Sequence, residues 1–202
     1  MPSEAAPGVD AGGPTPSQTV GPFFAFVLTP TDYEVRPIVS DRLWTEDADG
    51  ERIRLEGYIL DGDDEPIVDA MIEVWQADGR GRYPGPGGRG NTAFTGFGRA
   101  EVDSTGLFSF ETVRPGAVPG PDGVAQAPHI NLGIFARGLL RRLATRVYFE
   151  GEAANKADPI LALVPPERRS TLVASRLERG GDKVFHHVIR LQGEDETVFF
   201  DL

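Results

Sequence analysis

The sequence predicts a mainly β protein, namely a β-sandwich with one short helix and long loops. Three observations support this fold class. The chain holds 25 Gly and 17 Pro, and so many turn formers favour short strands joined by irregular loops. Residues 53–59 alternate apolar and polar side chains, as a strand with one buried face does. The 202 residues suit one domain, and no repeat or linker divides them. We therefore expect a single sandwich with a Greek-key or related layout.

The first 30 residues are expected to form a flexible tail followed by an extended arm. Residues 1–14 are mostly Pro, Gly, Ala and Ser, which cannot bury enough apolar surface to offset their ordering entropy. The domain then covers residues 15–202. Its opening segment, 15–30, is stiffened by Pro16 and Pro22 and carries three Phe. Such an arm can lie across another chain or cover one end of its own sandwich, and composition leaves both interpretations open.

The strands are expected at short intervals along the rest of the chain. The turn at 103–106 predicts a hairpin between its two flanking strands. Residues 166–177 open with Pro and Glu, as a helix start does. The long loop at 114–127 is a candidate functional segment, because long loops in compact domains are often functional. The expected strands are 52–59, 67–76, 94–102, 107–113, 129–136, 143–149, 184–191 and 197–201.

Composition and charge disfavour several classes of protein. The net charge of −11 lowers the expectation of a nucleic-acid binder, which usually carries a basic face. The chain has no Cys, so disulfides and thiolate metal sites are excluded. Its longest apolar run, Phe23–Leu28, is too short to span a bilayer. The first residues lack the basic and apolar regions of a secretory signal, so a cytoplasmic location is expected.

Few residues have the pattern of a metal site. His186 and His187 are adjacent on an expected strand, so they point to opposite faces. His129 and Asn131 share one face, where two His would bind the same ion. A neutral amide is a poor ligand for a transition metal, so the pattern has the geometry of a metal site but lacks half of it. A His that is hydrogen-bonded inside the domain is the favoured interpretation. Tyr83 lies in a Gly- and Arg-rich loop; a phenolate can bind ferric iron, but a packing or interface role is more common.

No other motif marks a catalytic centre. A nucleophile elbow and a Walker loop are absent from the sequence, and the Gly-rich stretch 85–90 is a weak phosphate-loop candidate because it contains Pro and opens no helix. Arg137, Arg141, Arg142 and Arg146 form a basic cluster in an acidic chain. The cluster can bind an anionic substrate or an acidic partner, or it can be a solvated edge, and both interpretations stay open for Arg141 and Arg142. The 31 acidic residues also leave open a carboxylate metal site.

Several segments taken together resemble the intradiol ring-cleavage dioxygenases. They follow one another in the order of that family and cover the chain from about residue 15 to its end. Because several motifs occur in matching order, the resemblance is far more specific than any one of them. The segments are Thr15–Phe23, Glu73–Asp78, Ala127–Asn131, Phe135–Gly138, Thr145–Phe149 and Thr197–Asp201.

The resemblance implies an intradiol dioxygenase/transthyretin-like sandwich and a specific chemistry. These enzymes cleave catechol rings between the two hydroxyl groups with non-haem Fe(III) and O2. The two-chain members cleave protocatechuate (3,4-dihydroxybenzoate) to 3-carboxy-cis,cis-muconate, in the β-ketoadipate pathway of aromatic degradation. They pair homologous alpha and beta chains in a larger hetero-oligomer, and the beta chain binds iron through two Tyr and two His. Our chain is most similar to the alpha type.

The family's iron positions are only partly kept in this chain. Tyr83 and His129 fall at a tyrosine and a histidine position, whereas Val118 and Asn131 fall at the other two. Gln126 stands at the position of an arginine thought to stabilise substrate charge. The resemblance therefore implies a vestigial metal site, no metal in this chain, and no catalytic residue of its own. Iron is expected on the partner beta subunit.

The resemblance gives this chain a role at the partner's active site. Thr19, Gly21 and Pro22 of the arm, together with Arg137, are expected to line the substrate pocket around the beta-chain iron, so that residues 15–30 pack on the partner. A cationic Arg suits a catecholate that carries a carboxylate. Two alternatives remain: a non-catalytic β-sandwich binding module, whose fold is compatible, and a self-contained dioxygenase with a carboxylate site.

Overall fold

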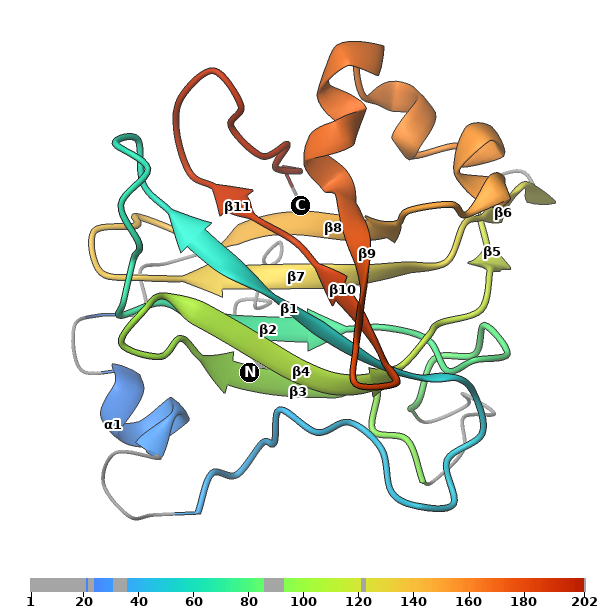
Figure 1. Ribbon diagram of the computed structural model, residues 1–202, viewed down its shortest axis with the longest axis horizontal. Coiled ribbons are helices and arrows are strands. Elements are labelled where there is room, and N and C mark those ends of the chain that lie inside the picture. The colour runs from blue at the N-terminus through green and yellow to red at the C-terminus, as the bar shows by residue number, and fades with distance from the viewer. Residues whose placement is uncertain (1–20, 22–23, 31–35, 86–92, 121–122, 202) are drawn as a thin grey trace, which may run out of the picture.

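The chain folds as two β-sheets packed face to face, which confirms the predicted sandwich (Figure 1). A computed structural model describes residues 21, 24–30, 36–85, 93–120 and 123–201.

The first sheet has the strand order β4, β1, β10 and β9, and β11 extends it beside the end of β1. Strands β1 and β4 are antiparallel, whereas β1 and β10 are parallel. The bounds are Arg52–Leu60 (β1), Leu107–Val113 (β4), Val173–Arg179 (β9), Asp182–His186 (β10) and Ile189–Arg190 (β11).

The second sheet has the strand order β3, β2, β7 and β8, and all its neighbours are antiparallel. Strand β9 joins the two sheets, because its first residues pair with β8 and its later residues pair with β10. A short ladder, β5 with β6, lies beside the second sheet. The bounds are Met71–Trp75 (β2), Phe97–Glu101 (β3), Val118–Pro119 (β5), Ala125–Gln126 (β6), His129–Phe135 (β7) and Leu143–Phe149 (β8).

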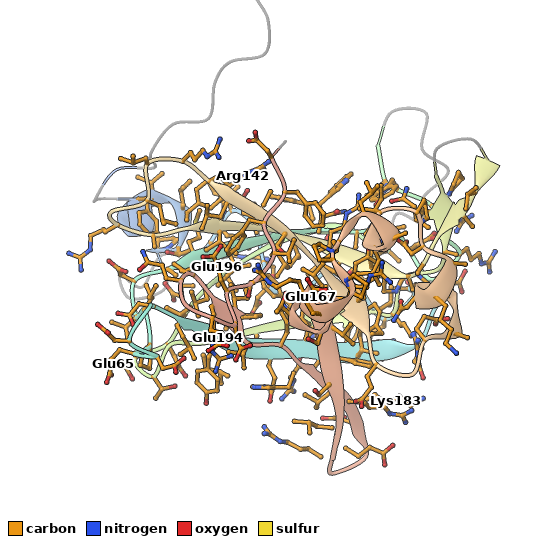
Figure 2. The ribbon with its side chains drawn as sticks, turned by 90° about the horizontal axis from the view of Figure 1, so that it is seen from above. Glu65, Arg142, Glu167, Lys183, Glu194 and Glu196 are labelled. Atoms are coloured by element: carbon orange, nitrogen blue, oxygen red, sulfur yellow. The ribbon has the colours of Figure 1, made fainter. Side chains whose placement is uncertain are left out.

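The main core lies between the sheets and is built by the alternation seen in the sequence. Each sheet turns every second side chain inward, and the inward residues form one large buried cluster. Phe149 of β8 and Phe185 of β10 meet edge to face across the layers, with ring centroids 4.8 Å apart. Figure 2 shows side chains filling this space, with Glu65 and Lys183 at the periphery.

A second, smaller core lies on the outer face of β8. Three short 3-10 segments cover this face: η3 (Ala153–Ala157), η4 (Leu161–Leu163) and η5 (Pro166–Leu172). Tyr148, Leu161 and Leu172 are buried there together. This cover matters for the site, because it removes one end of the outer face from solvent.

The predicted hairpin at 103–106 is wrong. The turn forms, and Asp103 Oδ1 accepts hydrogen bonds from Thr105 N (2.7 Å) and Leu107 N (3.1 Å). However, β3 pairs with β2, and β4 pairs with β1. The turn therefore carries the chain from one sheet to the other, because both strands present apolar side chains to the same core.

Other local predictions also need correction. The helix expected over 166–177 is a 3-10 segment that ends at Leu172, and β9 begins at Val173 because β8 and β10 supply strand partners. Within the expected extended arm, Phe24–Leu28 form a helical turn, α1. The strand expected at 197–201 is reduced to one bridge, between Phe200 and Ala144. No helix in the described part of the chain is long and apolar enough to cross a membrane.

Candidate functional site

The four expected iron positions belong to segments that meet at one end of the second sheet. His129 opens β7, and Asn131 follows two residues later on the same face. The loop after β2 brings Tyr83 to Asn131, and β5 carries Val118. In Figure 1 this end of the sheet lies toward β5 and β6. His129 and Asn131 were predicted to share one face of a strand, and both lie in β7, two residues apart.

A partly buried ion pair between Asp78 and Arg82 fixes the loop that carries Tyr83. The Asp78 carboxylate accepts hydrogen bonds from the backbone N–H groups of Arg80 and Arg82 and from the Arg82 guanidinium, at 2.7–3.0 Å. Burial alone would raise the pKa of Asp78, but the hydrogen bonds from Arg82 and Arg80 outweigh it and lower that pKa. Tyr83 then stacks on Trp75, with centroids 5.5 Å apart and planes 18° apart.

Asn131 uses its amide for structure. Its Nδ2 donates to Trp75 O at 3.1 Å and lies 3.5 Å from the Tyr83 hydroxyl oxygen. An amide NH2 group is a donor without a lone pair for a metal. The Asn131 side chain therefore ties β7 to the Tyr83 loop.

His129 is held as a neutral, oriented imidazole. Its side chain is buried, and Nδ1 lies 2.7 Å from Ala127 O. Since a carbonyl oxygen can only accept, Nδ1 carries the proton and Nε2 keeps the lone pair. Burial lowers the pKa of His129, and the charge of Arg146 lowers it further, against a raising effect of the hydrogen bond to Ala127.

Asp158 holds the backbone segment that orients His129. Its fully buried carboxylate accepts from Ala127 N at 2.7 Å and from the Tyr148 hydroxyl at 3.0 Å. It also accepts from the backbone N–H groups of Ile160 and Leu161. Asp158 thus fixes residue 127, whose carbonyl orients His129. The sequence offered no signal for this role, since one Asp in a polar loop resembles many others.

Val118, the remaining expected position, is apolar, and its ladder partner Gln126 is hydrogen-bonded to the Arg146 cation. Val118 is buried and pairs with Gln126 in the β5–β6 ladder. Gln126 Oε1 accepts from Arg146 Nη1 at 2.8 Å, and Gln126 Nε2 donates to Pro119 O at 3.1 Å. Arg146 stands opposite Asn131 in the β7–β8 ladder, so both side chains leave the sheet on the same face.

An iron ion does not fit these residues. Fe(III) favours anionic oxygen and imidazole donors, and here an alkyl group and an amide stand at two of the four ligand positions, with the Arg146 guanidinium on the same face of the sheet as Asn131. Among the described residues, no three His, Asp or Glu side chains gather as a metal site would require.

Arg137 lies at the other end of β7. It sits in the turn after the strand, and about 13 Å of β7 separates Asn131 from the strand end that precedes this turn. Its side chain is 67% exposed and forms an ion pair with Asp69. Gly21 has a φ of +83° and open space around it. Thr19 and Pro22, the other expected pocket residues, lie outside the described residues.

Arginines of the basic cluster expected from the sequence have different partners, with Arg137 paired to Asp69 and Arg146 bonded to Gln126. Arg141 pairs with Asp201 at 3.0 Å on the surface. Arg142 lies at the molecular edge in Figure 2, and its aliphatic stem crosses Gly133, where an added Cβ would meet Arg142 Cδ at 3.1 Å. Arg146 contacts the residues around Asn131, because its guanidinium donates to Gln126.

Comparison with known proteins identifies relatives of this chain. The dioxygenase family model matches residues 21–190. The protocatechuate 3,4-dioxygenase alpha chain of Burkholderia cepacia is 46% identical over 197 residues, covering 93% of this chain and 97% of the relative. The protocatechuate 3,4-dioxygenase beta chain of the same organism is 34% identical over 158 residues, covering 73% and 67%.

Solved structures agree in fold. The dioxygenase domain of a dioxygenase–carbohydrate-binding fusion from Streptomyces sp. SirexAA-E is 25% identical, with a TM-score of 0.60, covering 92% of this chain and 100% of that one. The family model and the alpha-chain relative each span most of the sequence. The resemblance noted in the sequence is therefore confirmed, and the chain belongs to the intradiol ring-cleavage dioxygenase family.

Proposed function

We propose that this chain is the alpha-type subunit of an Fe(III) intradiol dioxygenase and binds no iron itself. The complete enzyme cleaves protocatechuate with O2 to 3-carboxy-cis,cis-muconate, and the iron is held by a homologous beta subunit. One observation carries the proposal: Val118 and Asn131 stand at two of the four expected ligand positions, and the Arg146 cation lies beside them. The likeness to alpha and beta chains supports the pairing.

The chain contributes to the partner's active site rather than building its own. The arm with Thr19, Gly21 and Pro22, together with Arg137, lines the substrate pocket of the beta subunit. Arg137 suits this role chemically, because two thirds of its side chain is exposed and its ion pair with Asp69 holds it at the surface. A guanidinium there would attract the carboxylate and catecholate charges of the substrate. The absence of Cys is compatible with work in the cytoplasm.

The pocket role can be tested with two arginines from one surface region. The chain is produced together with a homologous beta chain, and steady-state kinetics on protocatechuate are followed by O2 uptake. Arg137→Ala should raise KM and lower kcat/KM while the two chains still co-elute. Arg141→Ala is the matched control, since Arg141 is similarly exposed and also ion-paired, and it should leave the kinetics unchanged.

The outcomes separate the possible roles. If Arg137→Ala weakens chain pairing as much as activity, Arg137 is an interface residue only. If the wild-type chain never co-elutes with a beta-type chain and the mixture cleaves nothing, the subunit proposal fails. The binding-module alternative would then be favoured.

A further inference from the structure

A cationic side chain of the protein itself, Arg146, lies beside the vestigial site. Arg146 lies directly opposite Asn131 in the β7–β8 ladder, and the neighbouring pair on the same face is His129 with Tyr148. The Arg146 guanidinium reaches the β5–β6 ladder, where Nη1 donates to Gln126 Oε1 at 2.8 Å. Gln126 is in turn the ladder partner of Val118. The guanidinium thus ties β8, the ladder neighbour of β7, to the β5–β6 ladder, and β7 and β5 carry three of the four expected ligand positions.

The surroundings are organised around this charge. Burial raises the pKa of Tyr148, and the nearby Arg146 opposes that rise. The Tyr148 hydroxyl donates to the buried Asp158 carboxylate at 3.0 Å. Arg146 and Asp158 thus act on the same tyrosine from two sides of the cluster, one as a cation and one as a hydrogen-bond acceptor. The Arg146 guanidinium also lies over Phe200, 5.9 Å from the ring centroid.

We propose that Arg146 replaces the metal in this chain: its guanidinium is the resident cation of the vestigial site and keeps a metal ion out. This inference rests on the proposed function, and it adds a cause that the missing ligands do not provide. Loss of donors weakens metal binding, whereas a fixed positive charge repels a metal cation even when donors are restored. The site would therefore resist repair by ligand replacement alone.

The experiment restores the ligands with and without the cation. The first variant is Val118→Tyr with Asn131→His, which keeps Arg146. The second adds Arg146→Met, which has a similar length and no charge. The control adds Arg141→Met instead, a neutralisation on the surface away from the site. Each purified chain is titrated with Fe(III), and bound iron is measured by elemental analysis and by visible absorption of an iron–tyrosinate complex.

The expected result is that removal of Arg146 strengthens Fe(III) binding roughly tenfold or more, whereas Arg141→Met changes nothing. Equal affinity with and without Arg146 would overturn the proposal. An additional variant adds Arg146→Lys to Val118→Tyr and Asn131→His. It keeps the positive charge and should therefore bind iron as weakly as the first variant. Stoichiometric iron in the unmodified chain would instead refute the proposed function, so the two failures are distinguishable.

A measurement of stability covers the case in which the triple variant does not fold. Arg146→Met in the otherwise unmodified chain removes the donor to Gln126 and the charge near Tyr148. Its urea midpoint should fall well below that of Arg141→Met. A midpoint equal to the control would mean that the guanidinium balances nothing in this cluster, and the proposal would be rejected on that result alone.

Discussion

Asp158 gives the most decisive test of how the site is held. Its carboxylate is fully buried and accepts four hydrogen bonds of 2.7–3.0 Å, from the Tyr148 hydroxyl and from the backbone N–H groups of Ala127, Ile160 and Leu161. All four partners are donors. The replacement Asp158→Asn keeps the shape of the side chain but exchanges one acceptor oxygen for an NH2 group.

The magnitude follows from the two oxygens. Oδ1 accepts three of the hydrogen bonds, and Oδ2 accepts from Ala127 N. If the Asn oxygen keeps the three, its NH2 group faces the Ala127 N–H, and one charge-assisted hydrogen bond is replaced by two facing donors. Loss of such a bond with an unsatisfied buried donor costs about 2–4 kcal/mol, after partial relief from no longer burying a charge.

Urea unfolding followed by Trp fluorescence measures this loss. Asp201→Asn is the control, because that side chain is 86% exposed and its replacement should stay within about 0.5 kcal/mol of the wild type. Tyr148→Phe removes one of the four donors and should cost about 1 kcal/mol. If Asp158→Asn unfolds within about 0.5 kcal/mol of the wild type, Asp158 does not hold residue 127 as described.

Three further predictions concern the two sheets away from the site. Burial lowers the pKa of His187 to about 4, so the unfolded chain takes up this proton first as the pH falls. The contribution of His187 to stability is complete only well above pH 6.5 and falls as the pH drops towards 4. Roughly 2 kcal/mol of it is lost between pH 7 and pH 5. His187→Gln should flatten that part of a urea-midpoint profile, and an unchanged slope would refute it. Gly57→Ala places a Cβ 1.7 Å from His187 O and 3.1 Å from Phe108 Cζ. Thermal unfolding should therefore show a loss of about 3 kcal/mol or more in the free energy of unfolding. A variant as stable as the wild type would contradict this packing. Glu73 and Arg99 form an ion pair across β2 and β3, with side-chain exposures of 19% and 14%. A double-mutant cycle on the free energy of unfolding should give a coupling of about 1–2 kcal/mol. Zero coupling would show that this ion pair does not contribute to stability.

Local pattern predicted the strands that face the core, but it could not assign them to sheets. Leu107–Val113 and Leu143–Phe149 have the expected bounds, because their alternating side chains bury one face. The hairpin at 103–106 failed, since a tight turn fixes the direction of the chain and not the partner of the next strand. Residues 173–177 failed as a helix because strand partners from β8 and β10 outweighed a weak local preference.

The candidate site was predictable where it depends on spacing within one strand. His129 and Asn131 share a face because they are two residues apart, and the structure keeps that relation. Arg146 was visible only as one member of a basic cluster, because its contact with Gln126 depends on strand register and on the β5–β6 ladder. Such contacts between distant segments are set by tertiary packing and leave no periodic signal in a single sequence.

The central claim is that iron belongs to the partner and not to this chain. The direct measurement is the iron content of the purified chain after exposure to Fe(III), compared with the content of its complex with a homologous beta chain. We expect iron far below stoichiometry in the chain alone and one iron for each alpha–beta pair in the complex. Stoichiometric iron bound by the chain alone would contradict the account, because Val118, Asn131 and Arg146 would then not prevent metal binding.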